Sequence, residues 1–100
     1  MAVTPNNATS FEGLDFQPHA IGNGVQARTE YPNGYGASVV RFHGSYGSEE
    51  GLYELGVLHG GRLNYDTPIT NDVIGYLSPE RITELLKQIA ALPAIETATV

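Results

Sequence analysis

The chain has 100 residues, of which 41% are hydrophobic, and eleven acidic against five basic side chains give it a formal net charge of −6 at pH 7. A chain of this length holds one domain with one hydrophobic core, so we expect no separate catalytic domain. The acidic balance argues against direct nucleic-acid binding, which depends on Lys and Arg side chains that neutralise phosphates. We expect the charge to serve solubility, or contact with a basic protein surface.

Cysteine is absent from the chain. This removes disulfides, thiolate catalysis and zinc–thiolate sites, and agrees with a reducing cytosolic compartment. No apolar run approaches the roughly 20 residues of a membrane-spanning helix. We therefore expect a soluble cytoplasmic protein without a membrane segment.

The domain organisation is expected to be simple. Residues 1–10, MAVTPNNATS, are polar and aperiodic and predict a flexible N-terminal tail. Residues 11–92 predict a single folded domain, and residues 93–100 follow a helix stop as a C-terminal tail.

The first elements are extended. Phe11, Leu14 and Phe16 predict an edge strand or arm that ends at Pro18, since proline cannot donate a ladder hydrogen bond in a central strand. Residues 25–31 then alternate between apolar or small and polar side chains, which is typical of a half-buried strand.

Two turn sequences set the strand register. Pro32-Asn33-Gly34 is typical of a three-residue hairpin loop with Gly34 in the left-handed conformation, and Gly60-Gly61 turns a second hairpin. The cross-strand pairs expected from these turns are Tyr31 with Tyr35, Thr29 with Ala37, Ala27 with Val39, Val25 with Arg41, Leu58 with Leu63 and Gly56 with Tyr65.

In this register two strands carry apolar side chains on both faces. Val40 and Phe42 lie opposite the predicted core face, and the apolar side chains of residues 53–58 also divide between two faces. Such strands are covered on each side, or use one face for contact with a partner.

One helix is predicted near the end of the domain. Ser78 supplies the N-cap, Pro79 the first helical position and Glu80 a negative charge in the first turn, and the helix is expected to end near Leu92, before Pro93. Its apolar stripe consists of Ile82, Leu85, Leu86 and Ile89. The predicted fold class is therefore α+β: an antiparallel four- to five-stranded β-meander with this helix packed on one face.

The glycine-rich loop over residues 44–51 is a candidate contact surface. Tyr46 lies between glycines, and Glu49 and Glu50 follow it. Tyrosine on a mobile, exposed loop is a good contact residue, although a plain hairpin connection is the alternative. The loop lacks the lysine and following helix of a phosphate-binding loop, and a strand follows where a nucleophile elbow requires a helix.

A second candidate is a polar cluster on the second hairpin. His59, Arg62, Asn64, Asp66 and Tyr53 share one face in the predicted register. Such a group can bind a small polar ligand, or form ordinary cross-strand pairs.

The segment from Asp66 to Asp72 is either an acidic recognition loop or a turn stabilised by its own Asp, Thr and Asn side chains. It does not have the ligand spacing of a calcium loop. His19, His43 and His59 lie in or beside different predicted strands, without the short spacing of a local metal site. We therefore expect no cofactor, no metal and no catalytic residues.

Three runs carry a resemblance: NGYGASVVR at 33–41, LYEL at 52–55 and YDTPITNDVIG at 65–75. Over roughly residues 11–92, the chain resembles a group of small uncharacterised proteins encoded by bacteriophages and prophages. The resemblance implies no activity and no catalytic residue. It implies a context, because small phage proteins of this size and charge often bind and inhibit a host machine, including antiviral defence complexes.

The expected function is therefore that of a non-enzymatic phage-type protein in the host cytoplasm. As a monomer or homodimer, it would bind a host protein or protein complex and modulate or inhibit it, with anti-defence inhibition as one form. The expected binding residues are Tyr46, Glu49, Glu50, Tyr53, His59, Arg62, Asp66 and Asp72. Two alternatives stay open: a small-ligand or nucleotide-binding protein or minimal enzyme with a pocket between sheet and helix, and a virion assembly factor.

Overall fold

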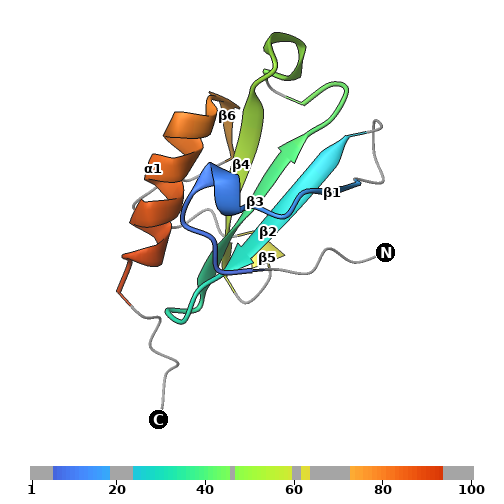
Figure 1. Ribbon diagram of the computed structural model, residues 1–100. Helices are drawn as coiled ribbons and strands as arrows, with labels where there is room; N and C mark the ends of the chain where they lie inside the picture. The colour runs from blue at the N-terminus through green and yellow to red at the C-terminus, as the bar shows by residue number, and fades with distance from the viewer. Residues whose placement is uncertain (1–5, 19–23, 46, 60–61, 64–72, 94–100) are drawn as a thin grey trace.

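The computed structural model describes residues 6–18, 24–45, 47–59, 62–63 and 73–93. The strands in these ranges are β1 (Gln17–Pro18), β2 (Val25–Glu30), β3 (Tyr35–Arg41), β4 (Tyr53–His59), β5 (Arg62–Leu63) and β6 (Ile74–Leu77). The helices are the 3-10 turns η1 (Phe11–Gly13) and η2 (Ser48–Glu50) and the α-helix α1 (Pro79–Ala90). Strands β1 to β5 follow one another in chain order in one sheet, and β6 pairs with β4 (Figure 1).

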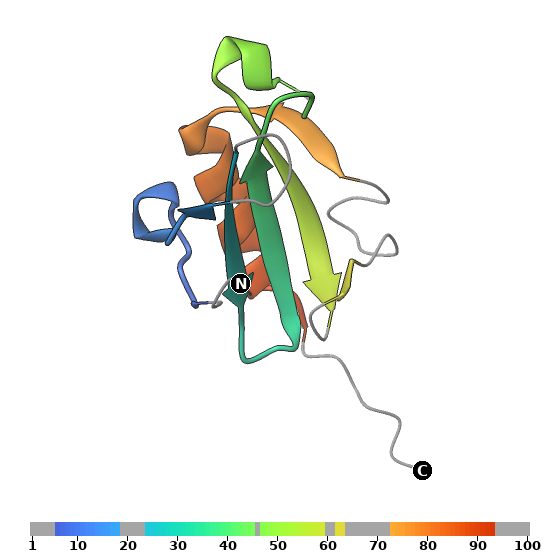
Figure 2. The same cartoon turned by 90° about the vertical axis from the view of Figure 1, so that its right-hand side faces the viewer.

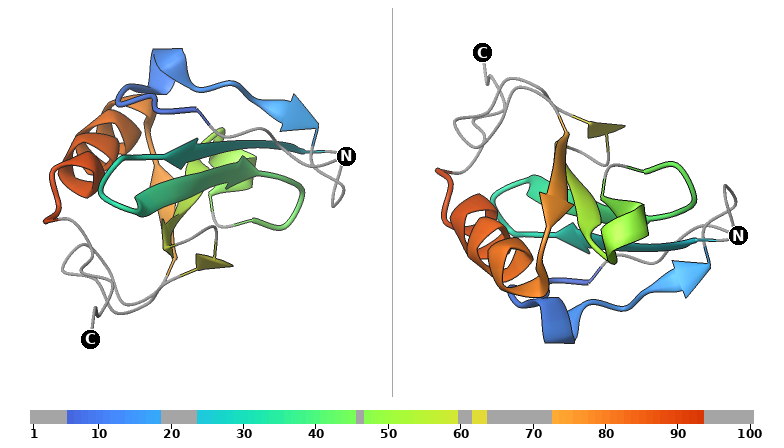
Figure 3. Two further views of the ribbon diagram at one scale, coloured as in Figure 1. Left: turned by 90° about the horizontal axis from the view of Figure 1, so that it is seen from below. Right: turned by 90° about the horizontal axis from the view of Figure 1, so that it is seen from above.

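The α+β fold class is confirmed. Every strand pair in the described part of the sheet is antiparallel. Helix α1 packs against one face of the sheet, and Figure 2 shows β2, β3 and β4 side by side with α1 behind them. The end views in Figure 3 show the same arrangement. The short strand β6, directly before the helix, was not predicted. Within the described ranges no helix combines the length and apolar composition needed to span a membrane.

The predicted register of the first hairpin is confirmed along β2 and β3, including the pairs Ala27 with Val39 and Thr29 with Ala37. The turn closes through the Tyr31 N–H, which donates to the Tyr35 carbonyl at 2.8 Å, and Gly34 has a φ of +90°. In the second hairpin Leu58 pairs with Leu63 as predicted. The predicted pair of Gly56 with Tyr65 lies outside the described residues.

The core lies between α1 and the sheet. It consists of Tyr31, Ala37, Val39, Leu55, Val57, Leu77, Ile82, Leu85, Leu86 and Ile89. A fully buried aliphatic side chain of this kind contributes roughly 1.5–3 kcal/mol to stability. These side chains fill the space in which a ligand pocket between sheet and helix was expected.

The other face of the sheet decides between the two predicted alternatives. Strand β4 is buried from Leu55 to Leu58, so the protein already covers both of its faces there. On β2 and β3 this face is mixed, because half-buried Val40 lies beside a polar pair in which Gln26 Nε2 donates to Ser38 Oγ at 2.9 Å. Of the two alternatives, coverage on each side therefore applies to β4, and the described face of β2 and β3 opposite the core does not form a continuous apolar surface for a partner.

The predicted edge strand or arm ends at Pro18 as expected, but only Gln17 and Pro18 pair with β2. The preceding residues turn inward as η1, and the Phe11 ring contacts those of Phe16 and Tyr53, at centroid distances of 5.6 Å and 5.1 Å. The Phe11 N–H donates to Thr83 Oγ1 in α1 at 2.9 Å. The apolar spacing of this segment thus reflects aromatic packing on the core.

Part of the predicted N-terminal tail lies along the sheet. Asn6 forms a parallel bridge with Thr29: its N–H donates to the Arg28 carbonyl at 3.1 Å, and its carbonyl accepts from the Glu30 N–H at 2.7 Å. Residues 1–5 lie outside the described residues. The edge of β2 is therefore covered by both Asn6 and β1.

Tyr31 ties the same segment to the core, and its hydroxyl donates to the Ala8 carbonyl at 2.5 Å. Burial raises the pKa of Tyr31 above its ordinary value of 10.0, an effect that a hydrogen bond with Thr29 partly offsets. Because the folded state holds this proton more tightly, its contribution to stability is full below about pH 10 and is lost as the pH rises through the folded pKa.

We expect Tyr31→Phe to lower the free energy of unfolding by about 1 kcal/mol at neutral pH, through loss of the hydrogen bond to Ala8. Above about pH 10 the stability of the variant should fall less steeply with pH than that of the wild type. Urea denaturation across this pH range measures both effects. Parallel curves for the two proteins at alkaline pH would contradict this assignment.

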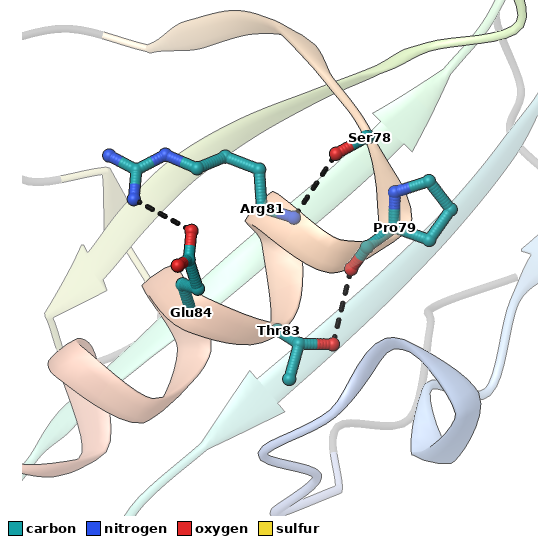
Figure 4. A network of polar contacts seen from close by, with 5 residues as sticks. All are labelled: Ser78, Pro79, Arg81, Thr83 and Glu84. Carbon is teal, nitrogen blue, oxygen red and sulfur yellow. Dashed lines mark hydrogen bonds and ion pairs between the residues drawn. The ribbon is translucent and has the colours of Figure 1, made fainter.

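The start of α1 follows the prediction. Ser78 Oγ accepts from the Arg81 N–H at 3.2 Å, and Pro79 occupies the first turn (Figure 4). Thr83 Oγ1 donates to the Pro79 carbonyl at 3.1 Å, and an exposed ion pair joins Arg81 to Glu84 at 3.1 Å. The N-terminal turn is thereby closed by its own side chains.

The other end of α1 is capped by a residue of the first hairpin turn. Asn33 Nδ2 donates to the carbonyls of Ile89, Ala90 and Leu92, at 2.9, 3.3 and 3.0 Å, while its Oδ1 accepts from the Tyr35 N–H at 2.9 Å. A single side chain thus joins the β2–β3 turn to the helix C-terminus.

Candidate interaction surface

The β3–β4 connection and the exposed residue of β6 form one end of the molecule. We call this surface, residues 42–45 and 47–50 together with Tyr76, the loop end. Figures 1 and 2 show η2 projecting there, at the opposite end from the β2–β3 turn. Tyr46 lies outside the described residues.

Backbone and hydroxyl groups hold the described part of this loop. Ser45 is 6% exposed, and its Oγ both accepts from the Phe42 N–H at 3.0 Å and donates to the Phe42 carbonyl at 2.8 Å. The Gly47 carbonyl accepts from the N–H groups of Glu50 and Leu52, at 3.1 and 2.9 Å. The loop was predicted to be mobile, but its described residues form consecutive hydrogen-bonded turns.

Gly47 brings the loop against β6. Its φ of +88° is the left-handed conformation, and a Cβ built on it would lie 2.9 Å from Tyr76 Cα and 3.0 Å from Leu52 Cβ. Only glycine suits a position that combines this φ with so close a backbone approach.

Tyr76 has an unusual backbone. Its φ is +57°, which costs a residue other than glycine about 1–2 kcal/mol. It lies where the pairing of β6 with β4 shifts register, between the pairs Leu77 with Tyr53 and Ile74 with Leu55. Of the large hydrophobic side chains in the described ranges, only that of Tyr76 is exposed, at 62%. Strained residues held by their surroundings are frequent at functional sites.

Two hollows flank η2. The first has a volume of about 350 Å³, and its lining includes Gly24, Arg41, His43 and Glu49. The second, of about 250 Å³, is lined by His43, Ser45, Gly47, Glu49, Glu50 and Tyr76, among others. Arg41 Nη2 donates to the Ser48 carbonyl at 3.3 Å, which attaches this guanidinium to η2.

Of the predicted binding residues, Glu49 and Glu50 lie together on the loop end, both exposed, beside Tyr76. The side chain of Tyr76 was not among the predicted residues. Its position two residues before the helix cap was visible in the sequence, but a left-handed tyrosine has no local sequence signal, since this conformation favours Gly, Asn and Asp.

The predicted polar cluster on the second hairpin lies only partly within the described residues, because Asn64 and Asp66 fall outside them. His59 pairs with Arg62 across the β4–β5 turn, and its ring lies 5.8 Å from that of Tyr35. Tyr53 is at the other end of β4, six residues away or about 20 Å at roughly 3.3 Å per residue. Asp66 and Asp72 lie outside the described residues.

No group of three or more His, Asp or Glu side chains in the described part of the chain could hold a metal ion. In the described residues, every buried side-chain nitrogen and oxygen atom has a hydrogen-bond partner. Comparison with protein-family models, with curated proteins and with solved structures gives no match to this chain.

Proposed function

We propose that this chain is a non-enzymatic binding protein of bacteriophage or prophage origin that binds a host protein or protein complex through the loop end. In the host cytoplasm it would modulate or inhibit that partner, and an antiviral defence complex is one such target. The resemblance of its sequence runs to small phage proteins supports the origin. The loop end supports the mode of action.

The observation that carries the proposal is Tyr76. The residue is 62% exposed, and its left-handed backbone lies in close contact with Gly47. Tyrosine has only two side-chain torsions and so loses little conformational entropy on binding, and it is enriched among the residues that dominate interface energies.

The charge of the loop end suggests the character of the partner surface. Glu49 and Glu50 are exposed next to Tyr76, on a chain of net charge −6. Complementary charge accelerates association and excludes wrong partners. The partner surface is accordingly basic around its contact with Tyr76.

The test is affinity purification of the tagged protein from bacterial cells. We expect wild type to recover a partner and Tyr76→Asn to recover at least tenfold less, because a dominant contact of about 2 kcal/mol corresponds to roughly 30-fold in affinity. Asparagine tolerates the left-handed conformation, so this variant should retain stability within about 1 kcal/mol. Gln88→Ala, on the exposed side of α1, is the control and should recover the partner fully.

Failure of the wild-type protein to recover any partner above background would contradict the binding role. Equal recovery by wild type and Tyr76→Asn would keep the role but remove the loop end as the surface. Circular dichroism of each variant separates loss of binding from loss of fold.

The larger hollow supports a second candidate, binding of a small polar ligand. Its volume of about 350 Å³ falls at the lower end of the roughly 300–1,000 Å³ of ligand sites, and Arg41, His43 and Glu49 supply polar groups. A nucleotide or metabolite that raises the melting temperature of wild type but not of His43→Ala would favour this role. No stabilisation across the panel would argue against it.

A further inference from the structure

The smaller hollow combines three features that suit a cationic side chain. Its volume of about 250 Å³ leaves room for one long side chain. Tyr76, whose side chain is exposed, is among the residues that line it, and so are the acidic residues Glu49 and Glu50. An aromatic face, a concave surface and negative charge therefore occur together.

The carboxylates of this hollow have no cation from the described part of the chain. Among the described residues, an ion pair joins Arg81 to Glu84 on α1, outside the lining of the hollow. Neither Glu49 nor Glu50 takes part in an ion pair with the described residues. Arg41, the last residue of β3, donates to the Ser48 carbonyl and lines the larger hollow, while His43 lines both hollows. Both acidic residues of the smaller hollow are therefore exposed and without an ion-pair partner in the described part of the chain.

We propose that the smaller hollow receives an arginine side chain of the partner protein, which deepens the proposed function and rests on it. The planar guanidinium stacks on the ring of Tyr76 and forms charge-assisted hydrogen bonds with Glu49 and Glu50. Arginine suits this arrangement better than lysine, because a guanidinium both stacks on aromatic rings and binds carboxylates through two parallel N–H groups.

The test uses N-acetyl-arginine methylamide as the probe, followed by amide NMR spectra of the isotopically labelled protein. We expect saturable shifts confined to the loop end, with a dissociation constant on the order of 1 mM for so small a ligand. The citrulline analogue has nearly the same shape without the charge and should cause no saturable shift. The lysine analogue should bind more weakly than the arginine probe.

Two double variants complete the test. Glu49→Gln/Glu50→Gln should weaken arginine binding at least about fivefold, since both charge-assisted contacts become neutral. Glu12→Gln/Glu84→Gln removes the same net charge from exposed positions elsewhere and should leave binding unchanged. Absence of saturable shifts, equal binding of citrulline, or equal effects of the two double variants would each overturn the proposal.

These outcomes are separate from those of the affinity purification. A partner that depends on Tyr76, together with a negative arginine titration, would keep the binding role and remove the arginine. Saturable arginine binding without any recovered partner would keep the hollow and remove the binding role.

Discussion

Gly47→Ala should lower the free energy of unfolding by about 3–4 kcal/mol, the largest loss that we expect for a single substitution in the loop end. A left-handed φ of +88° accounts for about 1–2 kcal/mol of this loss. The new methyl group would also lie 2.9 Å from Tyr76 Cα. Relief of such crowding costs about 1–3 kcal/mol more. Urea denaturation followed by circular dichroism measures the loss.

Gly44→Ala is the matched control. Gly44 has a φ of +100° in the same loop, but a Cβ there would have no neighbour within 4 Å. It should therefore lose only the backbone contribution of about 1–2 kcal/mol. The difference between the two variants measures the close contact of Gly47 with Tyr76 in β6 and with Leu52. Equal losses would mean that this contact does not fix the position of Tyr76.

Asn33→Ala should lower the free energy of unfolding by about 2–3 kcal/mol, because one truncation removes four hydrogen bonds. The Tyr35 N–H loses its acceptor and three carbonyls at the end of α1 lose a donor, while partial access to water moderates the loss. The same denaturation experiment measures it.

Asn33→Asp distinguishes helix capping from turn preference. Aspartate is as suitable for a turn and keeps the acceptor for the Tyr35 N–H, but it places a negative charge against the negative end of the helix dipole. It should therefore destabilise the protein at least as much as alanine does at neutral pH. An aspartate variant as stable as wild type would contradict the capping role.

The sequence predicted the elements whose signals are local. Pro32-Asn33-Gly34 and the alternation that precedes it were enough for the register of β2 and β3, and Ser78-Pro79 was enough for the start of α1. These signals act within a few residues, where turn chemistry and capping dominate.

The errors arose where distant residues decide the structure. The spacing of Phe11 and Phe16 predicted an extended strand or arm, but their rings pack on that of Tyr53. No local sequence pattern reveals this contact, because Tyr53 is distant in the chain. The second function of Asn33, as a cap for the far end of α1, requires knowledge of where the helix ends in space.

The candidate site was predicted in part. Glu49 and Glu50 were recognised as exposed acidic residues of a glycine-rich loop. Tyr76 was not recognised, because its exposure depends on an irregular pairing with β4 and on the approach of Gly47. Composition can indicate a contact loop, but only the fold places an aromatic side chain beside it.

Whether the loop end is the binding surface can be tested in bacterial cells by placing a photo-crosslinking amino acid at position 50 and detecting crosslinked complexes. A matched protein carries the same amino acid at position 84, where the Glu84 side chain is 64% exposed on α1. We predict a discrete crosslinked complex from position 50 and none from position 84. A complex from position 84 alone, or none from either position, would contradict the assignment of this surface.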